Sequence, residues 1–179
     1  DLPMGNEPGK VFNYNSGATL ILGHIFRLAT GTDIEEYAVE HLFTPLGIDD
    51  YYWDRTPYGL TDTQEGLYIS ARSLAKIAQL FLQKGRWQNE QVIPATWVEE
   101  STAPRYPTGK SDEEAYGYLW WSQPYTFKGK TVRAHFGKGF GGQRPIFLPD
   151  LNMVIVLTGW NILPGQPFLH AMEAVERVT

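Results

Sequence analysis

The chain has 179 residues, of which 42% are hydrophobic and 20% charged, a composition typical of one globular domain and not of a disordered chain. The net charge is −5 and no basic run is present, so nucleic acid is not an expected partner, and no apolar stretch is long enough to cross a bilayer. The absence of cysteine excludes disulfides, thiolate metal sites and a cysteine nucleophile.

The N-terminal part of the chain, residues 1–110, is expected to be mainly helical. Prolines and glycines mark residues 1–13 as a loop, after which a first helix is predicted to begin between residues 14 and 16. Apolar residues recur on one face of this segment as far as about Thr30, and Gly31 supplies a stop signal.

A second helix follows directly. Thr32 and Glu35 have the spacing of a capping box, and Pro45 and Gly47 are expected to end the helix. The next stretch, residues 48–66, is rich in aromatic and turn-forming residues and is predicted to be an irregular loop.

Two further helices are predicted before the character of the sequence changes. Ser70 is expected to cap an amphipathic helix that is closed by Gly85. A shorter helix opens at Pro94, a residue favoured in the first turn, and ends before Pro104.

The last part of the chain, residues 111–179, is predicted to form an antiparallel sheet and a closing helix. The closing helix is expected over residues 168–178, and residues 149–152 read as a hairpin connection. Helices first and strands second indicate an α+β fold. The predicted strands are short, rich in aromatic and β-branched residues, and lie at Tyr116–Ser122, Thr131–Phe136, Gln143–Leu148 and Met153–Thr158.

Three segments could carry chemistry. Tyr14 and Ser16, at the start of the first helix, place a phenol and a hydroxyl near one another. A phenol normally loses its proton near pH ~10, so a tyrosine that acts as a base needs a cationic neighbour. Taken alone, this pair is better explained by a half-buried aromatic beside a helix-capping serine.

The second segment is the glycine-dense stretch 134–143. Its glycines would let a strand edge approach a substrate closely and present a backbone N–H to an oxyanion. The plainer interpretation is a glycine-rich hairpin. The third segment has the Ser-x-x-Lys spacing of an activated serine, at Ser73 and Lys76. Both residues lie off the apolar stripe of their helix, so a solvated helix face explains them as well.

Several short segments occur in a recognisable order along the chain. They are Tyr-Asn-Ser-Gly, Pro-Leu-Gly-Ile, Gly-Leu-Tyr-Ile-Ser-Ala-Arg-Ser-Leu-Ala, Tyr-Gly-Tyr-Leu-Trp-Trp, and Gly-Gly-Gln followed by Leu-Pro-Asp (residues 14–17, 45–48, 66–75, 116–121, 141–143 and 148–150). This series, which extends over nearly the whole chain, resembles the serine β-lactamase-like hydrolases. That family includes class C β-lactamases, penicillin-binding DD-peptidases, and esterases and amidases similar to 6-aminohexanoate-dimer hydrolase.

The resemblance implies roles for two groups of residues. Tyr14 corresponds to the proton-transfer residue of the family's Tyr-x-Asn/Ser element, and Ser16 to its polar supporter. The family's Lys-Thr-Gly motif is replaced here in one of two registers, His135-Phe136-Gly137 or Gly137-Lys138-Gly139. The first is preferred because an imidazole can donate to a bound carboxylate or carbonyl. Either departure weakens an expectation of true β-lactamase activity.

The resemblance also implies that the nucleophile lies elsewhere. In this family the Ser-x-x-Lys motif precedes the tyrosine motif, whereas Ser73 and Lys76 follow Tyr14. The serine is therefore expected upstream of Asp1, and residues 1–179 are expected to be the C-terminal portion of a β-lactamase-like domain. Such a portion would be inert alone, and would be completed by oligomerisation or by an N-terminal fragment.

The implied function is that of a serine hydrolase fragment. The parent protein would cleave a small-molecule ester or amide through an acyl-enzyme, without a metal or an organic cofactor. The alternative is a binding or interaction module that keeps the scaffold without the chemistry. A further alternative makes Ser73 the nucleophile in an unusual motif order.

Overall fold

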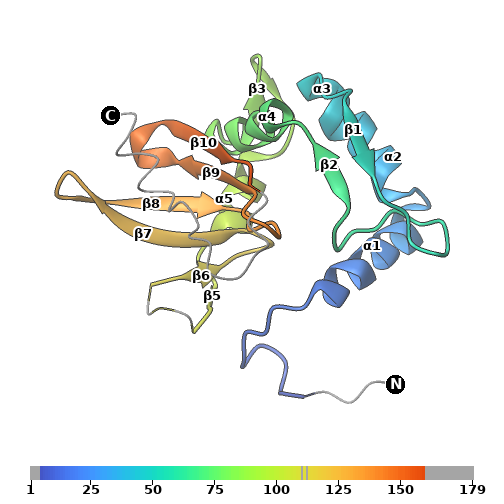
Figure 1. Ribbon diagram of the computed structural model, residues 1–179, viewed down its shortest axis with the longest axis horizontal. Coiled ribbons are helices and arrows are strands. Elements are labelled where there is room, and N and C mark those ends of the chain that lie inside the picture. The colour runs from blue at the N-terminus through green and yellow to red at the C-terminus, as the bar shows by residue number, and fades with distance from the viewer. Residues whose placement is uncertain (1–4, 110, 112, 160–179) are drawn as a thin grey trace.

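The computed structural model describes residues 5–109, 111 and 113–159. A helical layer from the first part of the chain lies beside an antiparallel sheet from the last part (Figure 1). This is the α+β arrangement that the sequence predicted. The closing helix predicted over residues 168–178 falls outside the described residues.

The first helix, α1 (Ser16–Thr30), lies where the sequence placed it. Gly31 ends it in the left-handed conformation, with φ of +75°, and donates its N–H to the Arg27 carbonyl oxygen at 2.8 Å. A residue with a Cβ is strained at such a φ, which is why glycine occupies the position.

The second helical segment is continuous but not uniform. It consists of α2 (Ile34–Ala38), a π-helical turn η1 (Val39–Phe43) and α3 (Thr44–Leu46). Two sequence predictions were wrong here. The N-cap is Asp33, whose carboxylate accepts the Glu35 N–H at 3.1 Å, and not Thr32. Pro45 lies inside α3, so only Gly47 ends the segment.

The predicted loop after this segment contains a strand. β1 (Tyr51–Trp53) pairs antiparallel with β2 (Leu67–Ile69). The intervening loop is fixed to β1 by the Trp53 indole, which donates to the Asp62 carbonyl oxygen at 2.8 Å. Consecutive aromatic residues favour strand structure, and here they provide enough partly buried surface to form it.

The remaining helices agree with the prediction. Ser70 caps α4 (Ala71–Leu82) by accepting the Ser73 N–H at 3.1 Å, and α5 spans Ala95–Thr102. A short hairpin that the sequence did not predict joins them, formed by β3 (Arg86–Trp87) and β4 (Glu90–Gln91). No helix in the described part of the chain is long and apolar enough to span a membrane.

The main sheet is antiparallel, with strand order β10-β9-β8-β7-β6-β5. The strand predicted over Tyr116–Ser122 is in fact divided between β6 and β7 by a turn in which Leu119 has φ of +66°. The other three predicted strands and the connection at residues 149–152 are confirmed. The strands are β5 (Tyr106–Pro107), β6 (Ala115–Tyr116), β7 (Trp121–Phe127), β8 (Lys130–Phe136), β9 (Arg144–Leu148) and β10 (Met153–Leu157).

The two faces of this sheet have different environments. On one face a buried cluster is joined by Phe12 and Tyr116; its members are Trp121, Val132, Ala134, Phe136, Ile146 and Leu148. On the other face Phe147 contacts Phe81 of α4, with ring centroids 5.9 Å apart. The side chains of a strand alternate between faces, so neighbouring residues of β8 and β9 lie in different surroundings.

Ile146→Ala tests the cluster on the first face. Ile146 is fully buried, so the substitution leaves a cavity and should lower the free energy of unfolding by about 2–5 kcal/mol. Ile21→Ala is the matched control. Its side chain is 60% exposed, and the loss should be within about 0.5 kcal/mol. Urea unfolding measures both, and equal losses would contradict the assignment of this core.

Candidate active site

Tyr14 lies in an aromatic cluster between the two layers. It directly precedes α1, its side chain is 56% exposed, and its ring contacts Tyr116 and Trp121 at centroid distances of 6.5 and 5.9 Å. Phe12 packs against the same two rings, at 5.1 and 5.9 Å. These contacts fix the extended segment before α1 against β6 and β7 and leave the Tyr14 side chain accessible.

Lys138 contacts the same tryptophan. Its ammonium lies 3.7 Å from the centre of the Trp121 ring, a cation–π contact, and 2.5 Å from Glu114 Oε2. Lys138 follows β8, whereas Tyr14 precedes α1, so the fold brings together residues that are far apart in sequence. Trp121 is thus the shared neighbour of a phenol and a cation.

Glu114 was not among the residues predicted from sequence. Its side chain is buried; besides the Lys138 ammonium, it accepts the Thr108 hydroxyl at 2.8 Å. Its backbone N–H donates to Ser111 Oγ at 3.1 Å. In sequence Glu114 is one acid in an acidic, polar stretch, and no motif separates it from an exposed glutamate.

Tyr116 adds a neutral phenol to the cluster. Burial raises the pKa of Tyr116 to about 12, and the nearby Tyr14 acts in the same direction. Tyr116 therefore keeps its proton at neutral pH and remains a hydrogen-bond donor beside the Tyr14 ring.

The structure does not bring His135 to this cluster. Alternation along β8 directs Val132, Ala134 and Phe136 to the Trp121 face and His135 to the opposite face. There its ring stacks on Phe147 at 4.9 Å. Burial, and secondarily the Arg133 charge, lowers the pKa of His135 to about 4 against a weaker opposing effect of Asp150, so the imidazole is neutral at pH 7.

Gly137 and Gly139, which flank Lys138, are bound to β9 and to the residue before it. The N–H of Gly137 donates to the Pro145 carbonyl oxygen at 3.1 Å, and that of Gly139 to the Gln143 carbonyl oxygen at 2.8 Å. A Cβ on Gly139 would lie 2.9 Å from Gln143 Cβ, so glycine is needed for this close approach.

The other candidate residues, Ser16, Ser73 and Lys76, lie outside the aromatic cluster. Ser16 is the exposed first residue of α1. The expectation of a solvated face is wrong for Ser73, which is 4% exposed and bonded to Asp50 Oδ1 at 3.1 Å. Lys76 donates to the Gly47 carbonyl oxygen at 2.5 Å. Ser73 and Lys76 therefore attach α4 to the turn after α3.

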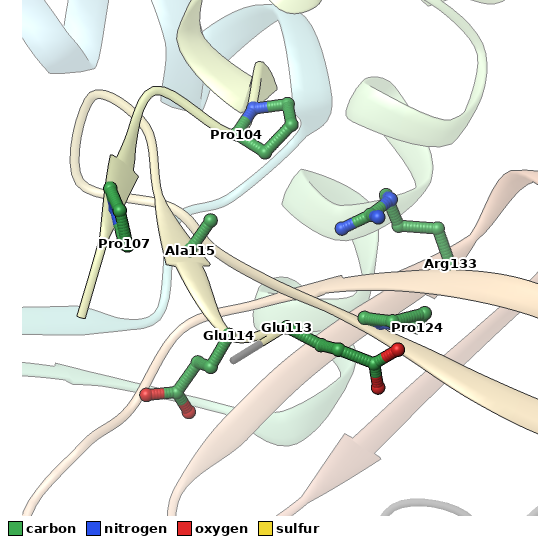
Figure 2. Close-up of a pocket in the computed structure, with 7 residues that line it drawn as sticks. All are labelled: Pro104, Pro107, Glu113, Glu114, Ala115, Pro124 and Arg133. Carbon is green, nitrogen blue, oxygen red and sulfur yellow. The ribbon is translucent and has the colours of Figure 1, made fainter. Parts of the chain in front are cut away.

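Two cavities lie near these elements, and neither is lined by Tyr14 or Lys138. One, of about 340 Å³, is lined by residues of β5, β6, β7 and β8 and of the segments that flank β5 (Figure 2). In that view the Glu114 carboxylate points away from the Arg133 guanidinium. The other, of about 620 Å³, lies between α1 and residues 55–64. The described residues contain no cluster of three or more His, Asp or Glu that could hold a metal ion.

Comparisons with known proteins identify the family and the fold. The family model described as Beta-lactamase matches residues 1–166. A Bacillus anthracis structure assigned as a 6-aminohexanoate-dimer hydrolase is 28% identical with a TM-score of 0.80; the match covers 91% of this chain and 42% of that one. A Bacillus halodurans penicillin-binding protein is 18% identical with a TM-score of 0.71; the match covers 99% of this chain and 59% of that one.

A class C beta-lactamase variant has the same fold. It is 14% identical with a TM-score of 0.64, and the match covers 98% of this chain and 58% of that one. No curated protein sequence matches the chain. The chain therefore spans between 42% and 59% of the length of these three structures.

The surroundings of His135 predict a pH dependence of stability. The unfolded chain binds a proton at His135 near pH 6.5, whereas the folded chain binds it only near pH 4. The free energy of unfolding should therefore fall as the pH falls from 6.5 towards 4. Urea unfolding across this range should show a shallower fall in His135→Phe, which keeps the stack on Phe147. An identical slope in both proteins would contradict the burial of a neutral imidazole.

The contact between Glu114 and Lys138 predicts a change in amine reactivity. In Glu114→Gln the carboxylate that accepts from the ammonium is replaced by a neutral amide, so acylation of Lys138 by an N-hydroxysuccinimide ester should become several-fold faster. Peptide mass spectrometry measures the rate at each lysine. Exposed Lys130 is the internal control and should not change. Unchanged labelling of Lys138 would show that Glu114 does not hold it.

Proposed function

Because the chain belongs to the Beta-lactamase family, whose members are typically serine hydrolases, we propose that it is part of a serine hydrolase that cleaves ester or amide bonds through an acyl-enzyme. The nucleophilic serine is supplied by polypeptide outside residues 1–179. This chain contributes the proton-transfer side of the site and is inactive alone.

The observation that carries this proposal is the meeting of Tyr14 and Lys138 at Trp121. A phenolate that accepts the serine proton needs a nearby positive charge, and the Lys138 ammonium lies on the Trp121 ring that Tyr14 also contacts. Tyr14 takes the proton from the serine hydroxyl during acylation and returns it to the leaving group. Tyr116 remains protonated, so its phenol can act only as a neutral group beside Tyr14.

This geometry supports Gly137-Lys138-Gly139, over His135-Phe136-Gly137, as the segment that replaces the family's Lys-Thr-Gly motif. His135 lies on the opposite face of the sheet from Tyr14 and stacks on Phe147. Lys138 and Tyr14 share a neighbouring ring. In the proposed enzyme Lys138 therefore takes the place of the motif's basic residue, and His135 has a structural role.

The oxyanion of the tetrahedral intermediate requires two N–H donors. One comes with the absent serine and the other from the end of β8. The N–H of Gly137 is bound to Pro145 of β9 and that of Gly139 to Gln143, so the donor has to be another N–H of this segment. Ser16 is at the start of α1, two residues beyond Tyr14, and remains a candidate for a polar contact with substrate.

Neither serine that the sequence singled out is suited to be the nucleophile. Ser73 is buried and bonded to Asp50, and Ser16 is exposed at the first position of a helix. A serine from preceding residues or from a complementing polypeptide resolves this. The 28% identity to a protein assigned as a 6-aminohexanoate-dimer hydrolase supports linear amides or esters as substrates. A non-catalytic module that keeps the fold is the alternative, and the experiment below separates the two.

Intact-protein mass after incubation with a fluorophosphonate, which tags activated serines, tests the function. We expect no adduct on residues 1–179 alone and a single adduct on a longer protein that includes the residues preceding Asp1. In that protein Tyr14→Phe should slow labelling by about 10²–10⁴-fold, because the proton acceptor is lost. The matched control is Tyr106→Phe, which removes a hydroxyl on β5 and should label at the normal rate.

Two outcomes would contradict the proposal. An adduct on Ser73 of the 179-residue chain would make that residue the nucleophile. A longer protein that takes up no reagent would favour the non-catalytic module.

A further inference from the structure

The cavity of about 340 Å³ lies on the face of the main sheet opposite to Trp121 (Figure 2). Its wall includes Pro124 of β7 and Arg133 of β8, which are paired across the two strands, and Ala115 of β6, which is paired with Ser122. Side chains alternate between the faces of a sheet, so these residues project away from the cluster around Trp121. The cavity therefore belongs to a different face of the sheet from the candidate active site.

Arg133 brings a positive charge to this cavity. Its Nη1 atom is buried and has no hydrogen-bond partner, and within the described residues no other arginine nitrogen is in this situation. Arg55, by comparison, contacts the carboxylates of Asp33 and Glu35. Buried donors in native structures are nearly always paired, and the planar fork of a guanidinium matches the two oxygens of a carboxylate. The buried nitrogen of Arg133 therefore indicates a carboxylate ligand.

Glu113 brings the opposite charge. It lines the same cavity and is exposed, and in the part of the chain that the structure describes no ion pair joins it to Arg133. In Figure 2 its side chain extends on the side of the cavity that Arg133 lines, whereas the side chain of Glu114 extends away from it. The Glu114 carboxylate accepts from the Lys138 ammonium at 2.5 Å. Two consecutive glutamates therefore serve different faces of the sheet, and Glu113 supplies the carboxylate for the cavity.

Two further polar atoms on this face of the sheet are buried without a hydrogen-bond partner. They are Ser122 Oγ and His135 Nδ1, which belong to a directly opposed pair of β7 and β8. Ser122 is fully buried and is also opposed to Ala115, a residue of the cavity wall. Polar atoms next to a cavity favour a ligand that carries hydrogen-bonding groups over one that is entirely apolar.

The apolar part of the wall is made of prolines. Pro104 follows α5, Pro107 belongs to β5 and Pro124 belongs to β7. A proline ring has no N–H and few conformations to lose, so it presents a rigid apolar surface that does not compete for the polar groups of a ligand. A volume of about 340 Å³ is near the lower limit for small-molecule sites. The cavity therefore fits a small molecule with one apolar group.

We propose that this cavity binds a small zwitterion, a molecule with the chemistry of a free amino acid or a short peptide. Its carboxylate pairs with Arg133, its ammonium pairs with Glu113, and its apolar side chain packs on the prolines. A simple anion would be attracted by Arg133 and repelled by Glu113, and a simple cation would meet the reverse, whereas a zwitterion is attracted by both. The proposal goes beyond the proposed hydrolase function and does not depend on it.

Titration of the isotope-labelled 179-residue chain with L-leucine, followed by the NMR shifts of its backbone amides, tests the site. We expect saturable shifts with a Kd of ~1–10 mM, because the ligand is small. Arg133→Gln and Glu113→Gln should each weaken binding at least tenfold. Glu113 is exposed, so its variant should keep the Tm of the parent chain. The matched controls are Arg72→Gln and Glu65→Gln, which change exposed residues outside the cavity and should bind L-leucine as the parent does.

Ligands that carry one of the two charges make the test specific. N-acetyl-L-leucine retains the carboxylate and L-leucine amide retains the ammonium, and each should bind at least tenfold more weakly than L-leucine. Comparison of L-leucine with glycyl-L-leucine separates the two sources of a zwitterion, because the tighter ligand identifies the site as one for amino acids or for short peptides.

Three results would overturn the proposal. N-acetyl-L-leucine that binds as tightly as L-leucine would make the cavity a site for anions. An unchanged affinity in Glu113→Gln would remove the ammonium contact and with it the zwitterion. The absence of saturable shifts with both L-leucine and glycyl-L-leucine would show that the cavity does not bind this class of molecule.

Discussion

The arrangement of the candidate site depends on the position of one indole ring. Trp121 opens β7 and is nearly buried, and its ring contacts Phe12, Tyr14, Tyr116 and the Lys138 ammonium. The backbone pairing of Trp121 with Phe136 sets where β8 ends, and hence where Lys138 emerges. A large aromatic surface can bind several partners at once, and its face attracts a cation. The segment before α1 and the segment after β8 therefore converge because both pack on Trp121.

The alternation of side chains along β8 explains why His135 does not lie at this site. In the stretch Val-Arg-Ala-His-Phe, residues 132–136, apolar and polar side chains alternate, so the sequence already places Arg133 and His135 together on one face. Sequence does not say which face carries Tyr14. That depends on the packing of Phe12 and Tyr14 against Trp121, a contact between residues more than a hundred positions apart. The preference for His135 rested on side-chain chemistry, whereas the geometry is decided by tertiary packing.

The elements that sequence predicted well are those with strong local signals. Ser70 caps the start of α4 and Gly31 caps the end of α1, and both caps act through hydrogen bonds within a few residues. The missed features depend on context. The break between β6 and β7 has Leu119 at a positive φ, a position where glycine or asparagine would have signalled a turn. The two-residue strands β3 and β4 are too short for a periodic pattern. Glu114 belongs to the candidate site because it accepts a hydrogen bond from Lys138, and no local sequence rule connects these two residues.

The exposed apolar face of α1, made of Ile21, Leu22, Ile25 and Leu28, is a second feature whose environment the sequence does not specify. A period of three to four residues specifies which face of a helix is apolar, but it does not specify what covers that face. In this chain the packed side of α1 is held by Thr63 and Tyr37, whereas the apolar side faces outward. Natural domains seldom leave such a face open, because burying it stabilises the fold. The same helix begins two residues after Tyr14, so its exposed apolar face and the proposed proton acceptor belong to one continuous stretch of the chain.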